Sequence, residues 1–165
     1  MPAAPLPEPA PATEACPGCG AVLAPVDGDV AAHPGASPSC TRLFDVTLRG
    51  PREEASADAG AVATARLADA AYDAQHPVAA EPARLSAALA QLGTALGAAA
   101  PTRPSGPPSA WTTTIADVAA DLDVIDLDVL VDSWARAVFA DWAAAGAPER
   151  DTDRLGNDAP STFGG

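Results

Sequence analysis

Three cysteines and two histidines are the residues of this sequence best suited to chemistry. Cys16 and Cys19 form a C-x2-C pair within the segment CPGCG, and Cys40 is the third and last cysteine of the chain. Glycine on either side of Cys19 lets the backbone turn so that nearby amides point at the sulfurs, as a zinc-knuckle turn requires. Thiolates combined with imidazole in a tetrahedral set select zinc over hard cations. The sequence therefore predicts one zinc site in its N-terminal part.

The fourth zinc ligand is either His33 or His76, the two histidines of the chain. His33 precedes Cys40 within the same loop, whereas His76 would reach the site from the end of a helix. Both histidines together with three cysteines would give five protein ligands, which is crowded for zinc. Asp73 lies three residues before His76, so its carboxylate could accept the imidazole N–H and orient the ring. A surface pair without any role is an equal alternative for that spacing.

Two kinds of zinc site are compatible with this ligand set. Four protein ligands close the ion off from substrate, whereas three ligands and a water leave an open, catalytic position. The second kind would be a hydrolase in which His76 and Asp73 act as base and orienting group. A third hypothesis is a redox sensor in which oxidation of Cys16 and Cys19 expels zinc. The motifs HExxH, GxSxG and GxGxxG are absent from the sequence, so no enzyme class is assigned.

The elements that must position these residues are mainly helices. Proline, glycine and aspartate between Cys16 and Cys40 predict a loop. Ser37 or Ser39 could cap a short helix that ends at Gly50 and Pro51. Hydrophobic spacing and capping residues predict further helices over about 58–75, 82–96, 114–118 and up to 145. We therefore expect a mainly α fold, a small bundle of four to five helices with an N-terminal zinc-knuckle loop.

Two later segments carry more specific predictions. Thr114 and Asp117 have the spacing of a capping box. The segment DLDVIDLDVL after them suits either a short strand or a helix start capped by Asp126 or Asp128. The two stripes predicted to face the core are Leu85, Leu89, Leu92 and Leu96 in one helix, and Leu127, Val131, Trp134, Val138 and Trp142 in the last.

Composition sets the domain organisation and excludes several classes of partner. Residues 1–14 and 147–165 are rich in proline, alanine, glycine and polar residues and predict disordered tails, which leaves one helical zinc-binding domain over 15–146. A net charge of −13 argues against nucleic acid and anionic membranes as partners. The absence of a signal peptide pattern and the odd number of cysteines predict a cytoplasmic protein. The nine basic residues are all arginine, which suits a GC-rich bacterial source.

Four motifs together resemble an uncharacterised bacterial family known only as a domain of unknown function (DUF5946-like). They are CPGCG at 16–20, HPGASPSC at 33–40, YDAQHP at 72–77 and WARAVFADW at 134–142. The resemblance implies that His76 belongs to the site, and that Tyr72, Asp73 and Gln75 lie around it. It implies no activity.

From the ligand set we predict a zinc-binding protein whose metal is structural and supports a surface for a protein partner. The sequence predicts no oligomeric state.

Overall fold

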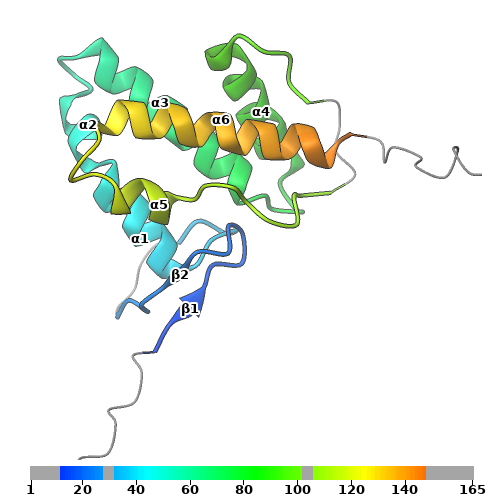
Figure 1. Ribbon diagram of the computed structural model, residues 1–165, viewed down its shortest axis with the longest axis horizontal. Helices are drawn as coiled ribbons and strands as arrows, with labels where there is room; N and C mark the ends of the chain where they lie inside the picture. Colours follow the sequence, from blue (N-terminus) through cyan, green and yellow to red (C-terminus); the bar gives the residue numbers. More distant parts are fainter. Residues whose placement is uncertain (1–11, 28–31, 102–105, 148–165) are drawn as a thin grey trace, which may run out of the picture.

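The fold is mainly helical, as predicted. The computed structural model describes residues 12–27, 32–101 and 106–147, and this part contains six helices and one two-stranded sheet. Figure 1 shows the sheet beside α1 at one side of the helices, with α6 crossing the whole bundle. The strands are β1 (Glu14–Ala15) and β2 (Val22–Leu23), and the helices are α1 (Pro38–Thr47), α2 (Arg49–Glu54), α3 (Ala59–Gln75), α4 (Pro82–Leu96), α5 (Ile115–Ala120) and α6 (Leu127–Ala145).

The predicted knuckle loop is a tight β-hairpin. β1 and β2 pair antiparallel, with Glu14 opposite Leu23 and Ala15 opposite Val22. The N–H of Cys16 donates to the carbonyl of Ala21 at 2.9 Å, and the N–H of Gly20 donates to the carbonyl of Cys16 at 2.9 Å. Gly20 has a φ of 75°, a conformation that residues with a side chain rarely adopt. The hairpin therefore places Cys16 and Cys19 on one short turn.

The helix that follows the loop begins as predicted but does not end as predicted. Ser37 is its N-cap, and its hydroxyl accepts the N–H of Cys40 at 3.2 Å. Gly50 and Pro51 do not end the helical region, because they lie inside the additional short helix α2. Pro51 is the third residue of α2, where the backbone N–H has no partner within a helix. Proline therefore fits the first turn of a new helix instead of terminating the old one.

α3 is the central helix, and it ends next to His76, one of the two histidines predicted as metal ligands. Asp58 caps its start by accepting the N–H of Gly60 at 2.9 Å. His76 is its C-cap, and Pro77 prevents another turn because it lacks an N–H. α3 packs against both α4 and α6, and the buried residues at these contacts are largely alanines, which let the helix axes approach closely.

The second half of the chain confirms the predicted capping box and most of the two core stripes, of which Leu85, Leu96 and Leu127 are only partly buried. Thr114 and Asp117 form the capping box of α5. Asp126 precedes α6 as its N-cap residue, so DLDVIDLDVL forms a turn and a helix start instead of a strand. Trp134 and Trp142 are fully buried in the core between α3 and α6. Leu89 and Leu92 of α4 are buried as well.

The limits of the domain stay a prediction. The predicted tails, 1–14 and 147–165, lie almost wholly outside the described residues, and Glu14 at the edge of the first is the start of β1. Within the described part, no helix combines the length and the apolar character needed to cross a bilayer.

Candidate metal centre

Four side chains from three separate segments converge on one point. The sulfurs of Cys16 and Cys19 in the hairpin turn, the sulfur of Cys40 in α1 and a ring nitrogen of His76 after α3 all lie within 4.8 Å of one another. Cys19 Sγ and Cys40 Sγ are 3.8 Å apart, and Cys40 Sγ and His76 Nε2 are 3.5 Å apart. A tetrahedral zinc ion with Zn–S bonds of about 2.3 Å spaces two sulfurs by about 3.8 Å. The donor set thus fits a zinc ion in both chemistry and size.

The two cysteine-bearing segments meet at the start of α1. Cys40 lies in the first turn of this helix, where the helix dipole favours a thiolate. The N–H of Ser37 donates to Cys16 Sγ at 3.4 Å. Ser39 extends the contact by donating to the carboxylate of Glu14 in β1. The N-terminal end of α1 therefore holds the hairpin through both backbone and side-chain hydrogen bonds.

His76 is oriented for metal binding by the backbone of its own helix. Its Nδ1 lies 2.7 Å from the carbonyl oxygen of Tyr72, which can only accept a hydrogen bond. Nδ1 therefore carries a proton, and Nε2, which faces the sulfurs, is the ring nitrogen that would bind a metal ion. This arrangement, a ligating nitrogen on one side and a hydrogen-bonded N–H on the other, is typical of histidines that bind metals.

Two glycines make room for His76, one for its ring and one for its backbone. A Cβ atom at Gly18 would lie 2.4 Å from His76 Cδ2 and 2.5 Å from the carbonyl oxygen of Gly35. A Cβ atom at Gly35 would lie 2.4 Å from the carbonyl oxygen of His76. The loop, the hairpin and the end of α3 thus approach too closely to admit any side chain at these two positions.

All three tryptophans of the chain donate their indole N–H to segments that carry the site. Trp111 donates to the carbonyl of Gly18 at 2.9 Å. Trp134 donates to Oε1 of Gln75 at 3.2 Å, and Trp142 donates to the carbonyl of Ala74 at 2.9 Å. The second half of the chain therefore fixes the hairpin and the end of α3 in place. Hydrophobic spacing predicts Trp134 and Trp142 in the core, but it does not predict these bonds, which depend on long-range contacts.

His33 lies beside the four-residue group without joining it. Its Nε2 is 2.9 Å from Oδ1 of Asp73, and its Nδ1 accepts the N–H of Gly35 at 3.1 Å. Asp73 therefore pairs with His33, whereas the sequence spacing suggested a pair with His76. Asp73 also lies 3.6 Å from Nη1 of Arg84. Burial lowers the pKa of His33, although the Asp73 carboxylate acts in the opposite direction. His33 is thus a neutral bridge between the cysteine loop and α3.

The other two residues that the resemblance placed around the site have different surroundings. The hydroxyl of Tyr72 lies 3.7 Å from Cys40 Sγ and 3.3 Å from Oγ1 of Thr41. Burial raises the pKa of Tyr72, so the phenol stays protonated and donates. Gln75 is fully buried, and its Nε2 donates to the carbonyl of Thr113 at 2.7 Å. Tyr72 therefore contacts a candidate ligand, whereas Gln75 connects α3 to the segment before α5.

A family model matches the segments that build this centre. The model describes a family of unknown function (DUF5946), and it matches residues 14–104 and 96–143. The chain belongs to this family. The chain has no match among curated proteins or among solved structures. The DUF5946 match begins at β1 and runs into α6, so it includes all four members of the cluster and the three tryptophans.

The pKa values of the thiols in the four-residue cluster favour a bound cation. Interactions with Cys19 and Cys40 hold the pKa of the Cys16 thiol far below its usual value. The same cluster raises the pKa of the Cys40 thiol, because Cys16 and Cys19 lie against it. Burial alone would lower the pKa of His76, but hydrogen bonds to Cys16 and Cys19 raise it to about 9. The Cys16 thiolate is therefore stabilised and a thiolate at Cys40 is disfavoured, and a divalent ion would remove that repulsion.

Proposed function

We propose that this DUF5946 protein binds one zinc ion that is structural, and that the ion supports a surface for a protein partner. The observation that carries the proposal is the closed set of four buried donors, Cys16, Cys19, Cys40 and His76. Three thiolates and one imidazole are a donor set that zinc takes in structural sites. Reduced thiols of this kind suit the cytoplasm.

A structural role fits the place of the site in the fold. The hairpin contributes few apolar side chains to the core, with Ala21 buried and Leu23 partly buried. Zinc bound between hairpin, α1 and α3 would supply the stabilisation that this small interface lacks. The ion would thus fasten an otherwise weakly held element onto the helices and define the surface on that side.

A hydrolase is less well supported by the surroundings of the site. Four protein ligands fill the tetrahedral positions, and the ligand side chains are at most 5% exposed. His33 is the nearest other imidazole, but both of its ring nitrogens are engaged, one by Asp73 and one by the N–H of Gly35. It is therefore not placed to accept a proton from a water molecule.

A redox sensor is a second candidate because two of the thiolates are close enough to react. Cys19 Sγ and Cys40 Sγ are 3.8 Å apart. Attack of one thiolate on hydrogen peroxide would give a sulfenic acid and hydroxide, and attack of the other thiolate would release a second hydroxide and form the S–S bond. Zinc would then retain only Cys16 and His76 and dissociate. The sequence predicted oxidation of Cys16 and Cys19, whose sulfurs also lie within 4.8 Å of each other. Peptide mapping of peroxide-treated protein would identify which pair forms, and three free thiols with zinc retained after peroxide would refute the redox candidate.

The test of the main proposal is the metal content of anaerobically purified protein, measured by mass spectrometry. We expect one zinc per chain in the wild type and in His33→Ala, and at least a tenfold weaker zinc affinity in His76→Ala. Wild-type protein should also lose the near-UV circular dichroism contributed by Trp111, which is bonded to the hairpin, when a chelator removes the ion. Absence of zinc from the wild type would refute the proposal, and full affinity in His76→Ala would show that the site is open.

A further inference from the structure

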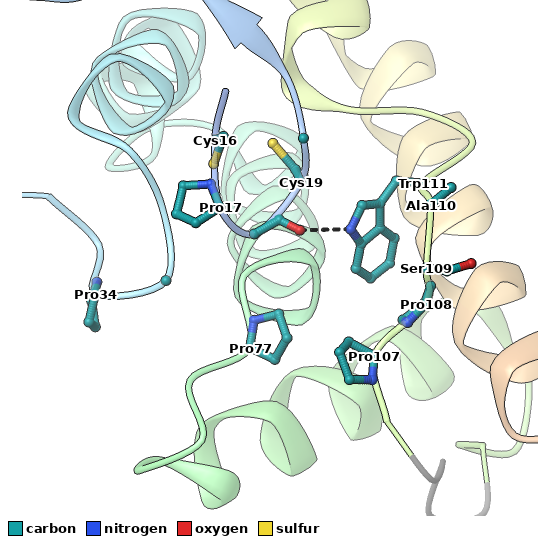
Figure 2. Close-up of a pocket in the computed structure, with 13 residues that line it drawn as sticks. Cys16, Pro17, Cys19, Pro34, Pro77, Pro107, Pro108, Ser109, Ala110 and Trp111 are labelled. Carbon is teal, nitrogen blue, oxygen red and sulfur yellow. Dashed lines mark hydrogen bonds between the residues drawn. The ribbon is translucent and has the colours of Figure 1, made fainter. Parts of the chain in front are cut away.

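A cleft of about 640 Å³ lies directly against the outer side of the metal centre. Figure 2 shows that the hairpin turn with Pro17 forms one wall and that Trp111 and Pro107 form the opposite wall. Pro77, which follows the ligand His76, closes the cleft between them. The indole N–H of Trp111 is bonded to the carbonyl of Gly18, so this bond fixes the spacing of the two walls. The volume falls within the range of clefts that hold ligand groups.

The described walls of the cleft consist mainly of proline and indole rings, small side chains and backbone. No charged side chain is among the described residues that line it, although the chain as a whole has a net charge of −13. Loss of charge together with flat apolar surface is the composition found at the core of protein interfaces. The lining residues are Cys16, Pro17, Gly18, Cys19, Gly20, Pro34, Gly35, Pro77, Pro107, Pro108, Ser109, Ala110 and Trp111.

A second cleft lies next to the first, along the surface of α4. This second cleft has a volume of about 680 Å³ and shares Pro77 and Pro107 with the first. Its remaining walls include Leu85 and Leu89 of α4 and the ring of Trp142. The two neighbouring clefts together offer more space than a single small molecule needs. An extended peptide would occupy this shape, with successive side chains in the two halves.

We propose that this groove binds an extended, uncharged segment of a partner protein, and that an aromatic side chain of the segment enters the cleft beside the metal centre. The pyrrolidine rings and the indole offer flat faces against which a planar ring packs. Aromatic side chains are also the usual anchors of protein interfaces. The proposal rests on the structural zinc proposed above, because the hairpin that forms one wall is fastened by the metal.

Trp111 makes the cleft observable in solution. Trp134 and Trp142 are 0% and 1% exposed, whereas Trp111 is only partly buried and lines the cleft. A ligand in the cleft should therefore change the fluorescence of Trp111 and its quenching by acrylamide. Ala110 is exposed and lines the same cleft, so Ala110→Glu would add a charge there without disturbing the core. Ala90→Glu adds the same charge on an exposed position of α4 outside both linings.

The experiment selects phage-displayed random peptides on the zinc-loaded full chain and measures synthetic copies by titration of Trp111 fluorescence. We expect enriched peptides with an aromatic residue among uncharged neighbours. Their affinity should fall at least tenfold in Ala110→Glu and stay within twofold in Ala90→Glu. Chelation of zinc should also abolish binding, because it releases the hairpin wall.

Each other outcome counts against a distinct part of the reasoning. Zinc-dependent peptides that bind Ala110→Glu as well as wild type would overturn the cleft and leave the metal-supported surface standing. No enrichment on fully zinc-loaded protein would overturn the peptide proposal alone. Binding of N-acetylphenylalaninamide as tightly as the peptides would show a small-molecule cleft and refute a peptide ligand. Protein that holds no zinc would refute the proposed function itself.

Discussion

Substitution of Gly18 by alanine should disturb the metal centre from outside the ligand set. The new Cβ would lie 2.4 Å from His76 Cδ2 and 2.5 Å from the carbonyl oxygen of Gly35. Ordinary van der Waals contacts begin at 3.4 Å, so the imidazole must move by about 1 Å. Metal–ligand distances tolerate only about 0.2 Å. Overpacking of this kind costs about 1–3 kcal/mol, which corresponds to a zinc dissociation constant raised by roughly fivefold to 150-fold.

The matched control is Gly20→Ala in the same turn. Gly20 has a φ of 75°, and an added Cβ meets no atom of the described residues within 4 Å. Alanine there costs about 1–2 kcal/mol of backbone strain but does not push on the imidazole. The assay is titration with Co²⁺, whose absorption bands report the ligands, followed by competition with zinc. We expect an altered three-sulfur, one-nitrogen spectrum in Gly18→Ala and an unchanged one in Gly20→Ala. Identical spectra and affinities for the two variants would refute the assignment of His76 as a ligand.

Three further predictions concern the pH response, the tryptophan frame and metal removal. The folded pKa of His76 is about 9 and its ordinary value is 6.5. Protonation of His76 should therefore add to the free energy of unfolding of the metal-free protein, in full below pH 6.5 and progressively less as pH rises toward 9. Urea unfolding at several pH values would detect this dependence. The variant His76→Ala should lack it. Trp142→Phe leaves the buried carbonyl of Ala74 unpaired and should cost about 1–3 kcal/mol in thermal unfolding, whereas Trp111→Phe, at a partly exposed site, should cost less. Chelation should raise amide hydrogen exchange in 14–23 far more than in α6, and equal increases would contradict a hairpin-specific role.

The parts of the site that are local in sequence could be predicted from the sequence. The C-x2-C turn, the Ser37 cap and the placement of Cys40 in a first turn depend on residues within a few positions of one another. The limits of α3 follow from Asp58 at its start and Pro77 after its end. Capping residues and prolines act over one helical turn, so they predict where a helix begins and ends without knowledge of the tertiary structure.

The choice between the histidines could not be predicted, because it depends on packing. His33 is closer to the cysteines in sequence, yet the end of α3 brings His76 among the sulfurs and leaves His33 against Asp73. The spacing of Asp73 and His76 suggested that they interact across a helix face. Since His76 is the C-cap, its Nδ1 turns back to the carbonyl of Tyr72 and Asp73 is free to meet His33. Because the helix ends at His76, the spacing of three residues does not bring the side chains of Asp73 and His76 together.

The tryptophan contacts explain why the helical bundle need not depend on the metal. Trp134 and Trp142 join α6 to the last turn of α3 through bonds that involve no candidate ligand side chain. The hairpin, by contrast, is held by the metal ligands, by the start of α1 and by the single bond from Trp111. Loss of zinc should therefore open the hairpin first, while His76 keeps its position at the end of α3. Because the hairpin is also one wall of the cleft, the proposed zinc site and the proposed binding surface would be coupled, and a partner that binds the cleft should in turn slow the release of zinc.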